Sequence, residues 1–241
     1  MKKFITLFRI ELKLNIRDFS GVLFGVIIPI GLMFLLGTLY KDASRIQESV
    51  PAVITIGICA TGLMGIPITL SSYREKKLLR RFQVTPTSPL LLLMVQFAAN
   101  FVTALISSVG VIILAVLMFE YKLEGNIISF LILYVLILFS IYSLGILIAS
   151  ISKSVSMSNL LCSLIYFPMF FLSGATVPFE FMPKGLQVVA QVMPLTHGIK
   201  ILKGISLGHS MKDYFLPITI LLLLGVLCMI VSVMTFKYDY E

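Results

Sequence analysis

The spacing of charged residues is the feature that most constrains this chain. Six stretches contain no Asp, Glu, Lys or Arg, and each is at least 22 residues long. A helix needs about 20 apolar residues to cross a bilayer, so each stretch can hold one span. The predicted spans cover residues 19–40, 50–71, 90–119, 127–150, 155–174 and 214–236. We therefore expect an all-α integral membrane protein, with residues 1–241 forming a single transmembrane domain.

The composition supports a membrane protein over a soluble one. Hydrophobic residues make up 59% of the chain and charged residues only 12%. A soluble domain carries about 25% charged residues, so this chain has too few polar residues to cover an apolar core in water. The cysteines Cys59, Cys162 and Cys228 all lie in apolar runs, and we interpret them as small buried hydrophobes.

The loops indicate which way the chain crosses the membrane. An even number of spans places both termini on one side. With the termini inside, the inner segments carry 12 Lys and Arg and the outer segments carry 7. Because basic residues concentrate in cytoplasmic loops, we predict that both termini are cytoplasmic.

The first 18 residues form a pattern that is typical of a helix lying in the membrane interface. Apolar and basic side chains each recur every four residues, on different faces: Phe4, Phe8, Leu12 and Ile16, and Arg9, Lys13 and Arg17. Such a helix buries its apolar face and keeps its cations near anionic headgroups. A plain charged segment preceding the first span is the alternative.

The spans lack the residues that several membrane functions require. No acidic, basic or histidine residue lies deep within them. Proton-coupled transporters and intramembrane hydrolases need such groups at membrane depth. The sequence also has no G-x-x-x-x-G-K-[ST] motif, so we do not expect this chain to hydrolyse ATP or to be an enzyme. We interpret His197 and His209 as interfacial polar residues.

The inner loop after the second span is strongly basic. Within "YREKKLLRRFQVTPTSP", residues 73–82 can form one helix with an apolar patch and a basic row of Arg74, Lys77 and Arg81. The helix must end before Thr85-Pro86, because a proline restricts the preceding residue to extended backbone. Ordinary positive-inside bias and a docking surface explain the basic residues about equally well.

The outer segment at residues 174–213 is too apolar for a solvated loop and too interrupted by proline for a span. A short helix fits between Pro183 and Pro194, and a second fits residues 195–206. We expect both to re-enter the outer leaflet, where helices satisfy their own backbone groups. A surface loop packed on the protein is the alternative.

Two stretches together resemble the ABC-2 family of ABC-transporter permeases: "YREKKLLRRFQVTPTSPLLLLMVQF" and "FFLSGATVPFEFMPKGLQVVAQVMPLTHGIKILKGI". The resemblance implies a subunit that works with a second permease chain, as a homodimer or heterodimer, and with a separate cytoplasmic P-loop ATPase. ATP and Mg²⁺ would then bind to the ATPase and not to this chain. It also implies residence in the bacterial plasma membrane, in contact with lipid and not with nucleic acid.

The resemblance also assigns roles to residues. The ATPase-coupling helix would comprise Tyr73, Arg74, Glu75, Lys76, Lys77, Leu78, Leu79, Arg80, Arg81 and Phe82, with Glu75 paired to a nearby Arg. The translocation pathway would involve Thr55, Cys59, Met64 and Thr69 of span two and Tyr166, Phe167, Phe170 and Phe171 of span five. The re-entrant motif would comprise Gly174, Pro178, Pro183, Pro194 and Thr196.

The candidate pathway is rich in aromatic and sulfur-containing side chains, which suits an apolar or amphipathic cargo. The resemblance implies that this cargo is a drug, antibiotic or lipid-like compound. The implied activity is export with resistance to such compounds. Two alternatives stay open: export of a polysaccharide or lipid-linked glycan, and a membrane scaffold or sensor that transports nothing.

Overall fold

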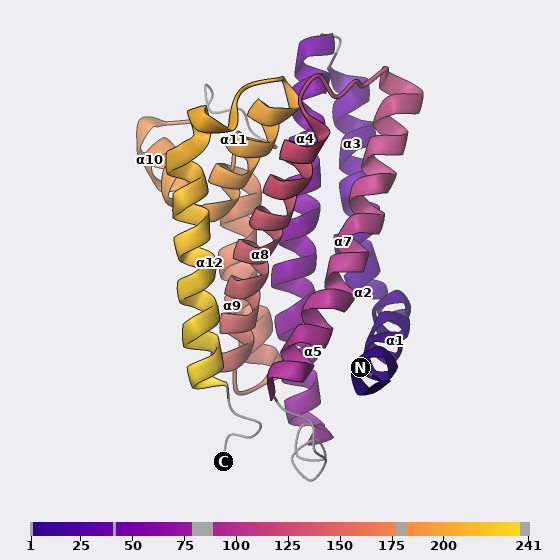
Figure 1. Ribbon diagram of the computed structural model, residues 1–241, viewed down its shortest axis with the longest axis vertical. Coiled ribbons are helices and arrows are strands. Elements are labelled where there is room, and N and C mark those ends of the chain that lie inside the picture. Colours follow the sequence, from indigo (N-terminus) through magenta and orange to yellow (C-terminus); the bar gives the residue numbers. More distant parts are fainter. Residues whose placement is uncertain (1, 41, 79–88, 177–181, 237–241) are drawn as a thin grey trace.

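The computed structural model describes residues 2–40, 42–78, 89–176 and 182–236, and this part of the chain is built from helices without a strand (Figure 1). Within these described ranges, six helices are long and apolar enough to cross a membrane: Phe19–Leu39, Ala43–Glu75, Leu90–Phe119, Ile127–Ile151, Val155–Leu172 and Met211–Thr235. The predicted all-α fold with six spans is therefore confirmed. The second span is longer at both ends than the predicted residues 50–71.

The described helices follow one another along the chain in the order given below. Helix α1 (Lys2–Arg17) precedes the first span, which consists of α2 (Phe19–Val22), the π-helical turn η1 (Leu23–Ile27) and α3 (Ile28–Leu39). The second span consists of α4 (Ala43–Ala60), the π-helical turn η2 (Thr61–Gly65) and α5 (Ile66–Glu75). The later elements are α7 (Pro89–Phe119), α8 (Ile127–Ile151), α9 (Val155–Leu172), α10 (Lys184–Val192), α11 (Pro194–Ser206), the 3₁₀ turn η4 (Met211–Tyr214) and α12 (Phe215–Thr235).

Two proline residues explain the π-helical turns. Pro29 and Pro67 each lie in the first turn of the helix that follows a π-helical turn. Proline has no N–H to donate and its ring collides with the carbonyl four residues earlier, so the preceding turn widens. At η2 the wider turn lies against α8, where a Cβ added to Gly145 would collide with the carbonyl oxygen of Gly62.

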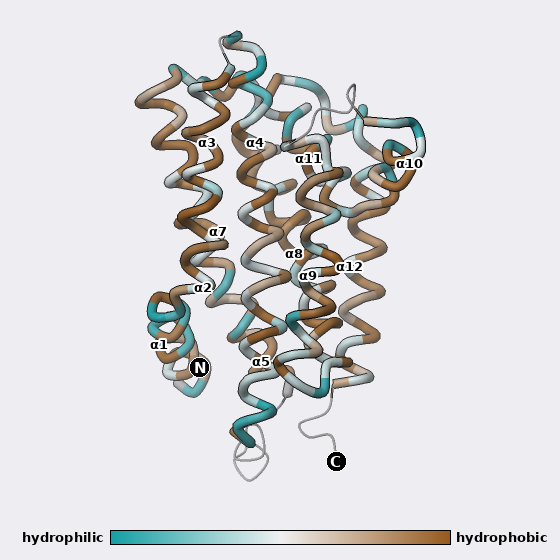
Figure 2. Tube along the Cα trace, turned by 180° about the vertical axis from the view of Figure 1, so that it is seen from behind, coloured by the Kyte–Doolittle hydropathy of each residue, from teal (hydrophilic) through white to brown (hydrophobic). Residues whose placement is uncertain are grey.

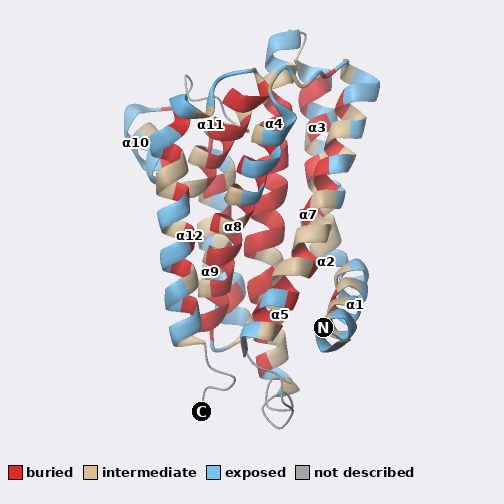
Figure 3. Ribbon diagram, viewed as in Figure 1, coloured by how far each residue is buried: buried red, intermediate tan, exposed pale blue. Residues whose placement is uncertain are grey.

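The second and fourth spans form the core of the bundle. Of the most apolar window in each span, 78% is buried in the second and 61% in the fourth, against 22–28% in the other four. Figure 3 shows this arrangement, with buried residues concentrated along α4 and α8 and exposed residues on α7, α9 and α12. The exposed faces are apolar along the middle of the bundle, whereas hydrophilic residues gather toward its two ends (Figure 2). Such a surface suits hydrocarbon around the middle and water at the ends.

The elements outside the spans lie at opposite ends of the bundle. Helix α1 and the last turn of α12 lie at the same end, as an even number of spans requires (Figure 1). Helices α10 and α11 lie at the other end. We refer to the first as the inner end and to the second as the outer end, following the predicted orientation. Helix α1 packs against α7 and exposes apolar side chains including Ile5, Ile10 and Leu14. Its position in the membrane interface stays a prediction.

Candidate functional site

The last turn of α5 directs three consecutive side chains toward three different helices. Tyr73 reaches α1, Arg74 reaches the end of α8, and Glu75 reaches the start of α9. Since residues 73–75 fall on the predicted coupling segment, we treat them together with Glu11 and the turn between α8 and α9 as the candidate site, and call it the inner junction.

Arg74 is buried although it is a charged residue. Only 4% of its surface is exposed, and its Nη1 donates hydrogen bonds to the carbonyl oxygens of Ala149, at 3.0 Å, and Ser152. The last carbonyls of a helix have no partner within the helix and carry partial negative charge, so they favour a cation. The ring of Phe236, just after α12, lies 5.7 Å from the guanidinium carbon. Arg74 therefore joins the second, fourth and sixth spans.

Glu75 makes the complementary contact at the next helix. Its Oε1 accepts a hydrogen bond of 3.2 Å from the backbone N–H of Val155, the first residue of α9. A helix N-terminus carries partial positive charge and favours an anion. Two adjacent residues of opposite charge thus meet the oppositely charged ends of two consecutive helices, and the end of α5 is tied to the turn at residues 152–154.

Buried serine residues add further contacts between α5 and α9, closer to the middle of the bundle. The hydroxyls of Ser71 on α5 and Ser158 on α9 share a hydrogen bond of 2.6 Å, and the Ser158 hydroxyl also donates to the carbonyl oxygen of Pro67 at 3.3 Å. Both serines are fully buried. A hydrogen bond between two helices is stronger in an environment without water, so α5 and α9 are linked over more than one turn.

Tyr73 connects the junction to α1. Its hydroxyl donates a hydrogen bond of 2.8 Å to Oε2 of Glu11, a carboxyl group whose residue is only 4% exposed. Burial raises the pKa of the Glu11 carboxyl above its ordinary value, while the hydrogen bond from Tyr73 acts in the opposite direction. Glu11 was not among the predicted site residues, although it lies three residues after Phe8 and next to Leu12, on the predicted apolar face.

The structure changes the description of the predicted coupling helix. Helix α5 ends at Glu75, and Lys77 adopts a left-handed backbone with φ of 55°, so residues 73–82 do not form one helix. Arg74 is turned inward to the carbonyls of α8, and so it does not share an exposed basic row with Lys77. Lys76 and Lys77 are exposed and Leu78 is half-buried. The remaining predicted coupling residues, Leu79, Arg80, Arg81 and Phe82, lie outside the described residues.

The predicted pathway residues divide into three groups by exposure. Thr55, Cys59 and Tyr166 are at most 2% exposed and pack inside the chain. Met64, Thr69 and Phe170 are half-buried. Phe167 and Phe171 are 43% and 53% exposed on the outside of α9. Burial of span two within the bundle explains why Thr55 and Cys59 are enclosed.

The predicted re-entrant residues are spread over the outer end. Gly174 follows α9 with a left-handed φ of 83°, Pro183 precedes α10, and Pro194 begins α11. Pro178 lies outside the described residues. Helix α11, which contains Thr196, is packed among α4, α8 and α12, whereas α10 is exposed along most of its length. The two predicted short helices therefore exist, but only α11 is enclosed by the bundle.

Comparison with known proteins supplies independent information. The family described as ABC-2 type transporter matches residues 2–207. The inner membrane transport permease YhhJ of Escherichia coli K12 is 28% identical over 133 residues, which cover 55% of this chain and 36% of that protein. Nodulation protein J of Rhizobium leguminosarum bv. trifolii is 34% identical over 71 residues, which cover 30% of this chain and 27% of that protein. The chain thus matches about a third of the length of these relatives.

Proposed function

Because this chain belongs to the ABC-2 type transporter family, we propose that it is the membrane subunit of an ATP-driven exporter in the bacterial plasma membrane. A separate cytoplasmic P-loop ATPase binds ATP and Mg²⁺, and a second permease chain completes the transporter. The inner junction faces the cytoplasm together with both termini. The cargo is an amphipathic drug, antibiotic or lipid-like compound.

The observation that carries this proposal is the set of contacts at the end of α5. The ATPase docks around the exposed Lys76 and Lys77 and the residues that follow them. When it moves, α5 transfers the displacement through Arg74 to the end of α8 and through Glu75 to the start of α9. Helix α1 follows through the contact between Tyr73 and Glu11. One docking surface thereby moves several spans together.

The second permease chain packs along the exposed face of α9. The large exposed side chains of α9 repeat at alternating spacings of three and four residues: Met157, Leu160, Leu164, Phe167 and Phe171. This spacing is that of a seam between two packed helices. Amphipathic cargo would move next to this seam, where Phe167 and Phe171 offer aromatic surface with little directional preference.

Charge reversal at the docking surface tests the proposal. The chain is expressed with its ATPase, the complex is isolated through a tag on this chain, and ATP hydrolysis is measured in vesicles. We expect Lys76→Glu with Lys77→Glu to lower co-purification and ATP hydrolysis at least about tenfold, because like charges replace complementary ones. The control reverses Lys184 and Lys212 at the outer end, which are equally basic and exposed. Equal losses in the two double variants would contradict the docking assignment.

Cysteine cross-linking tests the dimer contact. We expect Leu164→Cys to form an oxidant-induced disulfide between two chains in membranes, while Leu223→Cys on the exposed face of α12 does not. The native cysteines Cys59, Cys162 and Cys228 are buried, so they give little background. Cross-linking at Leu223 but not at Leu164 would place the interface on α12 instead.

A transport assay identifies the cargo class and separates an exporter from a scaffold. We expect vesicles that hold the complete complex to accumulate amphipathic fluorescent compounds only with ATP. ATP-dependent accumulation of a lipid-linked glycan without amphipathic compounds would change the cargo class. An assembled complex that moves neither class would favour the scaffold or sensor.

A further inference from the structure

A cavity of about 880 Å³ lies at the outer end of the bundle. Its walls come from the start of α4, the N-terminal half of α11, the segment that follows α9, and the start of α12. Pockets for small molecules commonly measure about 300–1,000 Å³, so the volume is large enough for a ligand. The cavity lies at the opposite end from the inner junction, and nothing in the coupling proposal uses it.

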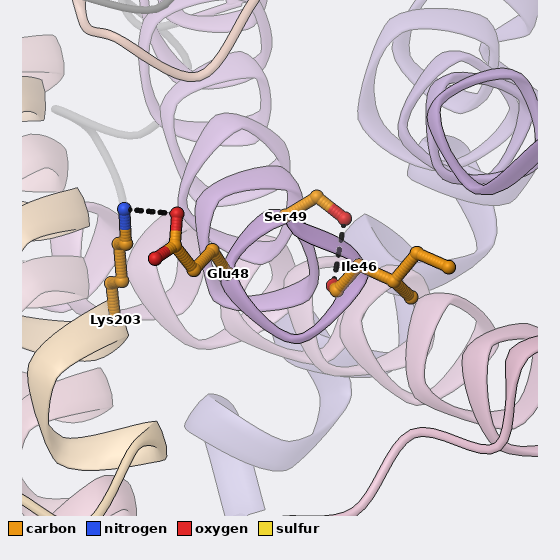
Figure 4. Close-up of polar contacts among 4 residues, drawn as sticks. All are labelled: Ile46, Glu48, Ser49 and Lys203. Atoms are coloured by element: carbon orange, nitrogen blue, oxygen red, sulfur yellow. Dashed lines mark hydrogen bonds and ion pairs between the residues drawn. The ribbon is translucent and has the colours of Figure 1, made fainter. Parts of the chain in front are cut away.

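The charges that line the cavity favour an anion. Three basic side chains line it, Arg45, Lys200 and Lys203, together with two acidic ones, Asp42 and Glu48. Glu48 is neutralised by an ion pair, whereas Asp42 makes only a hydrogen bond and keeps its negative charge, so the lining carries a net charge of +1. Asp42 accepts a hydrogen bond from the N–H of Ser44 at the start of α4, and Glu48 forms an ion pair of 2.6 Å with Lys203 (Figure 4).

Two cations therefore remain available within the described part of the chain. Lys200 is exposed to the cavity and forms no ion pair with a described residue. Arg45 lies over the ring of Tyr40, at 5.8 Å from its centroid, which leaves its N–H groups able to donate to an anion. Burial lowers the pKa of His197, which also lines the cavity, so its imidazole is neutral at pH 7 and adds no charge of its own.

A buried hydroxyl in the wall lacks a partner. Thr196 is only 7% exposed, lines the cavity, and its Oγ1 has no hydrogen-bond partner among the described residues. A buried polar group without a hydrogen-bond partner is costly, so such groups are uncommon unless a ligand or water completes them. The hydroxyl lies one helical turn before Lys200 on α11, so both residues belong to the same face of that helix.

We propose that this cavity binds an anionic phosphate or carboxylate group, with Lys200 and Arg45 as its charge partners and the Thr196 hydroxyl, now covered by protein, as a hydrogen-bond donor once its side chain rotates toward the cavity. Apolar residues such as Ala52, Ile199 and Pro217 line part of the wall, next to polar residues such as Ser49 and Gln191, and accommodate carbon atoms that adjoin the anion. The anion belongs to the headgroup of an amphiphile or is a free anion from the outer medium. This site is independent of the proposed exporter function, since it requires no ATPase.

The test measures binding to the purified full chain in a non-ionic detergent at constant ionic strength. The probes are dioctanoyl phosphatidylglycerol, dioctanoyl phosphatidylcholine and inorganic phosphate, and native mass spectrometry gives the affinities. We expect phosphatidylglycerol to bind about tenfold more tightly than phosphatidylcholine, and Lys200→Gln and Thr196→Val each to weaken it several-fold. Lys212→Gln is the matched control, because Lys212 is an exposed outer lysine that does not line the cavity.

Each outcome decides between the alternatives. Tight binding of inorganic phosphate that is equally sensitive to Lys200→Gln and Thr196→Val supports the anion site and identifies a free anion as its source. Equal affinity for the two lipids, with no binding of phosphate, overturns the proposal. Equal losses in Lys200→Gln and Lys212→Gln overturn it too, because they would indicate charge attraction to the whole outer surface. Lys200 is exposed, so its variant decides the matter even if Thr196→Val does not fold.

Discussion

The two ends of the bundle are held together by different kinds of contact. At the inner end, the charged residues Glu11 and Arg74 are each 4% exposed, and they contact a tyrosine hydroxyl and helix-terminal carbonyls. At the outer end, the ion pair of Glu48 and Lys203 leaves the side chains 42% and 38% exposed. Because electrostatic contacts weaken in water, the inner contacts fix the positions of helices and the outer pair leaves its surroundings open.

The outer end is itself divided along α11. Its last residue, Ser206, accepts hydrogen bonds from the backbone N–H groups of Glu124 and Gly125 and shares one with the hydroxyl of Tyr121. The N-terminal half of the same helix borders the cavity instead. The inner end and the C-terminus of α11 are therefore held by buried contacts. The cavity beside the N-terminal part of α11 is open to the outside of the bundle. The following changes test this difference, from the largest expected effect to the smallest.

Removal of Arg74 should have the largest effect. Arg74→Leu leaves the carbonyls of Ala149 and Ser152 without a donor in a buried site, so we expect it to lower the free energy of unfolding by about 3 kcal/mol. Thermal unfolding in detergent measures this change. Arg74→Lys, which keeps the charge, should recover part of it. If Arg74→Leu lowered the free energy of unfolding by less than Glu48→Gln in the outer ion pair does, the proposed difference between the two ends would be contradicted.

A methyl group at Gly125 tests the fixed part of the outer end. A Cβ there would collide with the backbone carbonyl oxygen of Ile205, which cannot move without shifting α11. We expect Gly125→Ala to destabilise the fold by about 2 kcal/mol, as overpacking does. Gly185→Ala is the control, because a Cβ at Gly185 meets no atom within 4 Å. Similar unfolding temperatures for the two variants would show that the end of α11 is not tightly fixed.

The pH dependence of stability tests the contact of α1. Burial raises the pKa of Glu11 in the folded chain above its ordinary 4.5, so the folded state binds more protons than the unfolded state between these two values. Stability from this group is therefore present at low pH and declines as pH rises through the raised pKa. We expect Glu11→Gln to flatten that decline, and thermal unfolding across the acidic range measures it. If the stability of the variant declined more steeply with rising pH than that of the unmodified chain, the pKa of Glu11 would not be raised by burial.

The outer ion pair should have the smallest effect. We expect Glu48→Gln to change the free energy of unfolding by about 0.5 kcal/mol or less, and 0.5 M NaCl to remove most of that difference. A double-mutant cycle with Lys203→Gln isolates the contribution of the pair. A coupling as large as the effect of Arg74→Leu would mean that the two ends are held with equal strength.

The number of spans was predictable from the sequence, whereas the inner junction was not. Uncharged stretches longer than a bilayer requires are a local property, so six spans follow from the sequence directly. The role of Arg74 depends on the end of α8, which lies 75 residues away along the chain, and no local pattern places the two together. The basic run around Arg74 suggested an exposed row, because burial of one arginine cannot be seen without its carbonyl partners.

The burial of Glu11 and the packing of the two outer helices were partly predictable from the sequence. Glu11 is the acid on an otherwise apolar face, and that position already indicates a polar partner in the protein. Helices α10 and α11 look alike as amphipathic segments, yet only α11 is enclosed. Two glycines of α11 distinguish it from α10, because they allow close packing against neighbouring helices. A Cβ at Gly198 would lie 3.1 Å from side-chain atoms of Ile137 and Thr55. A Cβ at Gly204 would collide with Tyr214.

The length of the second span has a consequence for both ends. Its 33 residues, Ala43–Glu75, rise about 50 Å at 1.5 Å per residue, while the hydrocarbon core of a bilayer is about 30 Å thick. Glu48 therefore meets water near one end of this helix, and Glu75 meets water at the other. The π-helical turn at Thr61–Gly65 is the place where the helix departs from a regular α-helical path. A single element longer than the barrier it crosses thus contacts the aqueous phase on both sides of the membrane.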